Sequence, residues 1–212
     1  MILLLASTVL SLIVLPLLAL YWLTRRSSCR LLWGLKAAAV GSYVGATFYL
    51  GGWHMLSYYG RYALLVLFVG TAVYGGWRMR RRIFWARPEG RDWTGPVLAS
   101  LLLLLGGAGL WAVYQSQQIP DDPVNVTFPL RDGAFYVASG GSQSLMNPHM
   151  KVQAPELQEW RGQLWGLDIV ELHPSGNRAS GLYPTTLDRY AIFGTPVYAP
   201  CDGTVEATDE TL

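Results

Sequence analysis

Two stretches set the character of the second half of this chain: GLDIV at 166–170 and YAIFGTPVYAPCDGTV at 190–205. In the first, Asp168 is a lone carboxylate within a strand-like apolar run. Such a carboxylate costs free energy to bury unless a cation or hydrogen-bond donors face it. In the second, short apolar runs are interrupted by two glycines and two prolines. That punctuation is typical of short strands joined by tight turns.

Working outward from these stretches, the second half of the chain reads as strands and loops. Glycine-containing loops separate five predicted strands, at 124–130, 135–138, 167–172, 192–198 and 204–207. No amphipathic helix longer than about ten residues, the length typical of a globular helix, is apparent. The polar segment 115–124 contains two prolines and predicts a linker. The expected fold class of residues 125–212 is therefore all-β with long loops.

The first half is apolar and predicts a multi-span α-helical membrane domain over residues 1–114. A transmembrane helix needs about 20 predominantly apolar residues. Four segments approach that length and composition, at 1–23, 31–52, 62–77 and 97–114. None of the four contains an acidic residue, which argues against a transport or proton-relay pathway. The lipid bilayer is thus the first expected partner.

Charge divides the chain in the same place. Residues 1–114 hold 11 Lys and Arg against 2 Asp and Glu, net +9, whereas residues 115–212 hold 5 against 12, net −7. The basic residues cluster after the first and third apolar segments, and only Arg61 lies between the second and third. By the positive-inside rule, this predicts a multi-pass protein of the cytoplasmic membrane with its C-terminal domain extracytoplasmic. The basic residues flank apolar segments instead of sharing one polar face, so no nucleic-acid partner is expected.

The two cysteines fall in different halves of the chain, Cys29 in the first and Cys201 in the second. The predicted topology places them on opposite sides of the membrane, so they are not expected to pair. Cys201 is then an unpaired thiol. We expect it to behave as a small buried hydrophobic residue.

Few side chains in the second half can carry chemistry. The main candidates are His149, Asp168 and His173, and Asp188 and Asp202 are secondary candidates. Histidine nitrogens and carboxylate oxygens are typical zinc ligands. Spacing alone is weak evidence, because no HExxH or CxxC motif is present. The plain alternative is that Asp168 caps a turn and His149 lies on a surface loop.

Five segments together resemble the lysostaphin/LytM-type zinc metallopeptidases: FPL at 128–130, GGS at 140–142, NPH at 147–149, LDIV at 167–170 and FGTPVYAPCDGTV at 193–205. The last is the most specific, because it follows the family's G-x-P-V-Y-A-P-x-D-G-x-V pattern. The resemblance implies a β-rich sheet fold, a zinc cofactor and cleavage of peptide cross-links in bacterial peptidoglycan. It also implies that this chain is a membrane-anchored variant.

The resemblance assigns Asp168 as the aspartate zinc ligand and His149 as the first histidine ligand. The family usually places that histidine four residues before the aspartate, where this chain has Leu164. His173 is the rival, although its odd offset from Asp168 would place it on the opposite face of a strand. The family's later His-x-His motif, which supplies the third ligand and helps to activate water, has no counterpart after Gly203.

The sequence therefore predicts a membrane-anchored zinc metalloendopeptidase of the cell-wall hydrolase type. Because the third ligand and general base are missing, we expect a C-terminally truncated, incomplete and inactive copy, and leave open whether it is an enzyme. The alternative is a non-enzymatic, peptidase-like module that binds cell-wall peptide or a partner protein outside the membrane. A third interpretation is a membrane protein that acts through its helices. The absence of acidic residues from the predicted spans argues against it.

Overall fold

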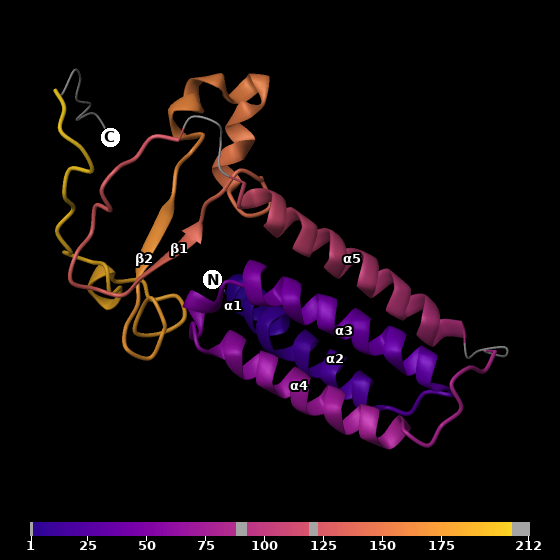
Figure 1. Cartoon of the computed structure of the whole chain (residues 1–212). Helices are drawn as coiled ribbons and strands as arrows, with labels where there is room; N and C mark the ends of the chain where they lie inside the picture. Colours follow the sequence, from indigo (N-terminus) through magenta and orange to yellow (C-terminus); the bar gives the residue numbers. More distant parts are fainter. Residues whose placement is uncertain (1, 88–92, 119–122, 205–212) are drawn as a thin grey trace.

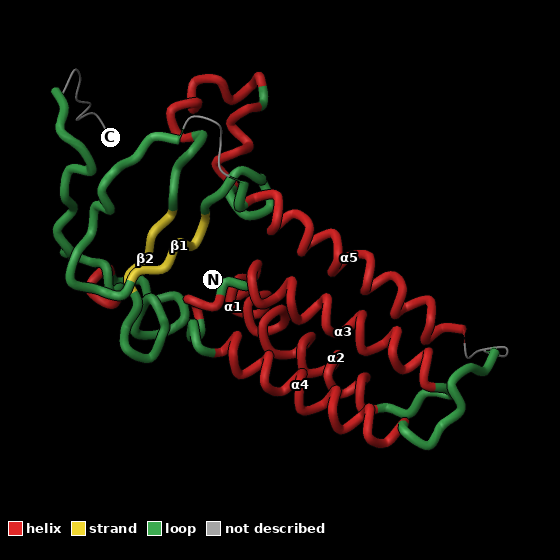
Figure 2. Tube along the Cα trace, in the orientation of Figure 1, coloured by secondary structure: helices red, strands yellow, loops and turns green. Residues whose placement is uncertain are grey.

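The computed structural model describes residues 2–87, 93–118 and 123–204 (Figure 1). Long helices form a bundle over residues 2–116, which we call the helical bundle. Residues 123–204, which we call the outer region, lie at one end of that bundle. They consist mainly of loops and short 3₁₀ helices, with one small sheet (Figure 2). The division between apolar and polar halves that the sequence predicts is thus visible in the fold.

The long helices follow the apolar segments of the sequence. They are α1 (Ile2–Val9), α2 (Leu15–Thr24), α3 (Arg30–Leu50), α4 (Gly60–Met79) and α5 (Thr94–Ser116). A π-helical turn, Leu10–Val14, joins α1 to α2 without interrupting the rod. Pro16 lies in the first turn of α2, and its missing N–H removes one helical hydrogen bond there. Widening of the preceding turn is a common response to such a loss.

Three helices in the described ranges are long and apolar enough to span a membrane: Leu3–Thr24, Gly60–Met79 and Thr94–Ser116. The four-span prediction is therefore supported for three of its segments. α3 covers the predicted second segment with 21 residues but is not among the three. Its sequence contains Arg30 and Lys36 as well as glycine, serine and threonine.

α3 is the central helix of the bundle. Its Lys36 is buried and donates hydrogen bonds to the carbonyl oxygens of Trp22 (3.4 Å) and Arg25 (3.1 Å) at the end of α2. Carbonyl groups at a helix C-terminus have no partner within the helix, and a cation suits the negative end of the helix dipole. Lys36 therefore links the end of the first helix to α3.

Glycines allow the helices to approach α3 closely. A Cβ added at Gly106 of α5 would lie 2.8 Å from the backbone carbon of Ser42 in α3. A Cβ added at Gly41 would lie 3.0 Å from the ring of Phe68 in α4. Small residues at such crossings are the usual means of close helix packing in membranes.

The outer region holds a single two-stranded antiparallel sheet within its described residues, β1 (Phe135–Ser139) and β2 (Asp168–Glu171). Tyr136 pairs with Val170, and a bulge before Ser139 brings that residue opposite Asp168. These strands confirm the predictions at 135–138 and 167–172. The all-β expectation for the whole region is wrong for the described residues, since short 3₁₀ helices occupy Pro148–Gln153, Pro155–Gln163 and Leu187–Arg189.

Two predicted strands, 124–130 and 192–198, are loops that touch each other at two points. Thr127 N–H donates to the Pro200 carbonyl, and Tyr198 N–H donates to the Pro129 carbonyl, both at 2.8 Å. Proline has no N–H to donate to a ladder. Prolines at 129, 196 and 200 therefore interrupt the pairing that a sheet would need. The fifth predicted strand, 204–207, lies outside the described residues except for Thr204.

The outer region is docked on the turn between α3 and α4. Tyr58 N–H donates to the Gly176 carbonyl at 2.6 Å, and Arg178 N–H donates to the His54 carbonyl at 2.8 Å. His54 is only 6% exposed, and its ring lies 5.3 Å from that of Tyr136 in β1. His54 lies in a short turn between two helices, yet it is buried because the outer region covers it.

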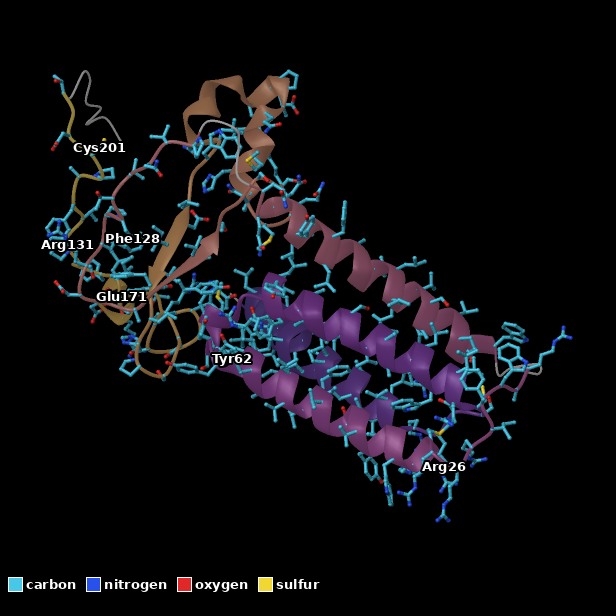
Figure 3. The ribbon with its side chains drawn as sticks, in the orientation of Figure 1. Arg26, Tyr62, Phe128, Arg131, Glu171 and Cys201 are labelled. Atoms are coloured by element: carbon cyan, nitrogen blue, oxygen red, sulfur yellow. The ribbon has the colours of Figure 1, made fainter. Side chains whose placement is uncertain are left out.

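The two ends of the bundle differ in character. The N-terminal end of α1 lies at the same end as the outer region (Figure 1), and Thr8 hydrogen-bonds the Tyr183 hydroxyl at 2.9 Å. Arg26 lies at the opposite end (Figure 3), where it lines a hollow with Arg78 and the arginines that follow it. The basic loops and the outer region therefore occupy opposite ends, as a positive-inside arrangement requires.

Candidate functional site

The structure brings His149 and Asp168 together, although 19 positions separate them in the chain. His149 Nε2 and Asp168 Oδ1 are 3.1 Å apart. Asp168 is the first residue of β2, and His149 lies on the helical turn Pro148–Gln153. The side chains are 26% and 52% exposed, so solvent and small solutes can reach both.

Asn147 holds the histidine in place. This side chain is 1% exposed, and its Oδ1 accepts a hydrogen bond from His149 N–H at 3.2 Å. Its Nδ2 donates to the carbonyl oxygens of Gly141 (3.0 Å) and Gly166 (3.2 Å). One buried amide thus ties together the glycine loop after β1, the turn that bears His149 and the approach to Asp168.

Sequence reasoning quoted Asn147 within a motif but gave it no role. The signal was available, because asparagine followed by proline is a typical start of a helical turn. Asparagine is a preferred N-cap residue, and proline suits the first helical position. What the sequence does not show is that the same amide also reaches Gly141 and Gly166, which only the folded loops place beside it.

The environment of Asp168 favours its charged form. The hydrogen bond from His149 is the main reason that its pKa lies below the ordinary value of 3.8. Partial desolvation opposes this shift, and a hydrogen bond from Ser139 and the charge of His149 add to it. Asp168 is therefore a carboxylate at neutral pH, as a metal ligand must be.

The pair has a separation that suits two ligands of one metal ion. Two ligand atoms about 2.0–2.1 Å from a tetrahedral zinc ion lie roughly 3.3 Å from each other. The observed 3.1 Å between Nε2 and Oδ1 is close to that value. No cluster of three potential ligands from His, Cys, Asp and Glu occurs in the ranges that the structure describes. The described residues thus fit two positions of a zinc site.

The other candidates lie apart from this pair. His173 is held in a turn, where its N–H donates to the Asn177 carbonyl at 2.9 Å, and its Nε2 is buried without a hydrogen-bond partner. Asp188 and Asp202 are exposed, and neither joins a ligand cluster among the described residues. Cys201 is also exposed, so the expectation of a buried thiol is wrong.

A small cavity of about 140 Å³ adjoins the pair. Ser139, which faces Asp168 across the sheet, lines it together with Pro148, which precedes His149. The opposite wall comes from the end of α3, including Tyr49 and Leu50. The candidate site therefore lies where the outer region meets the bundle, and both regions contribute to its surroundings.

Neither a protein-family model, nor a curated protein, nor a solved structure matches this chain. The likeness to the lysostaphin/LytM-type peptidases thus stands on the quoted motifs alone. Function has to be argued from the geometry of the site.

Proposed function

We propose that this protein is a membrane-anchored metallopeptidase of the zinc-dependent, cell-wall-directed type, in which His149 and Asp168 supply two of the metal ligands. The observation that carries the proposal is the 3.1 Å contact between His149 Nε2 and Asp168 Oδ1. Asp168 matches the family's aspartate position, and His149 is the histidine that the resemblance assigns from the upstream NPH segment. Their meeting in space across 19 positions of sequence is what two ligands of one ion require.

The chain's own residues prepare the site in three ways. The lowered pKa keeps Asp168 ionised, and Asn147 fixes the backbone that bears the imidazole. The exposure of both side chains leaves one side open to a peptide. A bound zinc ion would supply polarisation of the scissile carbonyl and a lowered pKa of its water. A further ligand and a general base are not assigned among the described residues.

Placement at a membrane supports the same proposal. Three helices have the length and composition of membrane spans, and the site lies at the end of the bundle opposite Arg26. If the arginine-rich end is cytoplasmic, the site faces the outside of the cytoplasmic membrane. Cell-wall peptides are found on that side, which makes them the proposed substrate.

A non-enzymatic module that binds cell-wall peptide is the second candidate. The observation in its favour is the lack of a three-ligand cluster in the described part of the chain. Such a module would use the same exposed pair to bind a peptide, with or without zinc, and would not turn it over.

Metal binding by the full chain in lipid nanodiscs tests the proposal. Cobalt(II) absorption and zinc competition with a coloured chelator would report the affinity. We expect His149→Ala and Asp168→Asn to weaken binding at least tenfold, and Asn147→Ala to weaken it about 10- to 100-fold through loss of positioning. His173→Ala is the matched control and should leave the affinity unchanged.

Peptide hydrolysis then separates the two candidates. Zinc-dependent release of fragments from a peptidoglycan peptide supports the peptidase, and saturable peptide binding without release supports the module. Metal affinity that is unchanged in both His149→Ala and Asp168→Asn would contradict the metal site in either case.

A further inference from the structure

An apolar groove of about 680 Å³ runs along the helical bundle toward the candidate site. Its walls come from the first helix, α3 and α5, represented by Leu15, Ala46 and Leu105. Two of these three elements, the first helix and α5, have the composition of membrane spans. The groove therefore faces the hydrocarbon region of a bilayer wherever these helices cross one.

Small residues create the groove floor. Gly106 brings α5 almost onto the backbone of α3, and a Cβ at Gly109 would already touch Ala46 at 3.4 Å. Leu105, on the wall, is 72% exposed in the absence of lipid. Small residues in the floor and an exposed leucine on the wall leave the groove empty of protein side chains. In a membrane, hydrocarbon would have to fill it.

The groove adjoins the smaller cavity near the candidate metal pair. Both hollows are lined by the same four residues, Leu50, Gly51, Gly52 and Leu145. Leu145 belongs to the outer region, and the shared glycines belong to the end of α3. The smaller cavity reaches Ser139 and Pro148, next to Asp168 and His149. The two hollows are thus adjacent, and the smaller one ends at residues that neighbour the pair.

We propose that the groove binds the hydrocarbon chain of a lipid-anchored peptide, whose peptide head then lies beside His149 and Asp168. The choice of the head rests on the proposed function, whereas the choice of a hydrocarbon chain rests on the groove alone. The volume falls in the range of about 300–1,000 Å³ that is typical of small-molecule sites.

The residues that line the two hollows match the two parts of such an amphiphile. Leu12, Leu15 and Leu102 line the groove between the helices, and Ser139 and Pro148 line the cavity at its outer end. A substrate anchored in the bilayer would enter the groove laterally from the lipid, and its anchor would hold the peptide head at a fixed distance from the bilayer. The site lies at that distance because the outer region is docked directly on the turn after α3.

Photo-crosslinking of the full chain in nanodiscs of phosphatidylethanolamine and phosphatidylglycerol tests this inference. The probe is an N-palmitoylated short peptide with a diazirine in its acyl chain. We expect peptide mapping to place the label on the groove-lining parts of α3 and α5, within 43–52 and 102–109. Unlabelled lipopeptide should compete for the label, and added phospholipid should not. Even labelling around the bundle, or equal competition by phospholipid, would overturn the inference.

Two neighbouring leucines give a matched pair of variants. Leu105 lines the groove and Leu104 does not, yet they are 72% and 69% exposed. Leu105→Trp should fill the groove and reduce labelling about tenfold, as expected from excluding two methylene groups. Leu104→Trp should leave labelling within about twofold of the original chain. Equal effects of the two variants would contradict a specific groove.

Metal-pair variants separate this inference from the proposed function. His149→Ala and Asp168→Asn should leave groove labelling unchanged while abolishing metal binding. Groove labelling that persists when the original chain binds no zinc supports the lipid site and contradicts the peptidase. Zinc binding without groove labelling supports the metal site and overturns the lipid-anchored substrate.

Discussion

The helical bundle and the outer region are held together by different means. In the bundle, Leu23, Val40 and Val44 are almost completely buried, and each helix satisfies its own backbone. In the outer region, the largest fully buried side chain is a polar one, Asn147, and loop-to-loop hydrogen bonds replace most of a sheet. The bundle can form from its own packing, whereas the outer region relies on a buried amide and on docking against the bundle.

The helical bundle should lose stability when a larger side chain is placed at its closest helix contact. Gly106→Val would drive a side chain into the backbone of α3, and we expect a loss of about 3 kcal/mol in the free energy of unfolding. Gly107→Val makes the same change where nothing lies within 4 Å, and should have little effect. Far-UV circular dichroism during denaturant unfolding in micelles measures both. Similar losses in the two variants would show that α5 does not pack on α3 through Gly106.

The outer region should lose stability when its buried amide is removed. Asn147→Ala leaves two carbonyls and one N–H without their partner, which costs about 2 kcal/mol. Hydrogen exchange should increase in residues 140–150 and stay unchanged in α3. Asn125→Ala, an exposed control, should alter neither. Increased exchange throughout α3 in Asn147→Ala would contradict the separation of the two regions.

The docking surface can be tested with two glycines of similar backbone conformation. Gly176 and Gly181 have φ of 81° and 111°, so alanine is strained at both by about 1 kcal/mol. Only at Gly176 would the new Cβ meet the bundle, 2.9 Å from Tyr58 N. We expect Gly176→Ala to lose about 1 kcal/mol more than Gly181→Ala, and to expose the turn 53–59 to protease. Equal behaviour would mean that this contact does not hold the regions together.

Acid should weaken the same interface by a smaller amount. Burial, aided by the charge of Arg178, lowers the pKa of His54 from 6.5 to about 4. Between these values the unfolded chain binds a proton that the folded chain does not, so stability is full above pH 6.5 and falls as the pH approaches 4. At pH 5.5 the expected loss is about 1 kcal/mol.

His54→Gln cannot titrate and should flatten this pH dependence. Arg178 and the ring of Tyr136 are the groups that face His54 from the outer region. Intrinsic fluorescence during unfolding at several pH values would measure the difference between the two chains. A slope that persists in His54→Gln would assign the effect to other groups.

The long helices could be predicted from the sequence, and so could the two residues of the candidate site. Long apolar segments predict helices because a helix satisfies its backbone within the segment, and α3, α4 and α5 lie where expected. The motifs predicted His149 and Asp168 as ligands of one ion; the fold brings the two side chains into contact, and the metal itself stays a prediction. The strands at 124–130 and 192–198 were wrong, because a strand needs a neighbour that can donate and accept, and the prolines prevent that.

Several features depend on contacts between segments that lie far apart in the sequence. His54 reads as a loop residue and is buried only because Arg178 and β1 lie over it. Asn147 reads as a cap and becomes the centre of the site only when Gly141 and Gly166 approach it. Lys36 reads as an interfacial charge and instead binds the end of α2.

By itself the sequence determined the apolar helices, the opposite charges of the two halves and the identity of the candidate ligands. These depend on composition and on interactions within one segment. The tertiary structure alone decided that α3 is central, that the outer region is docked on the α3–α4 turn, and that an apolar groove between the helices adjoins a cavity at the outer region. Those features arise from close packing and from polar groups that find partners many residues away, which local sequence does not encode.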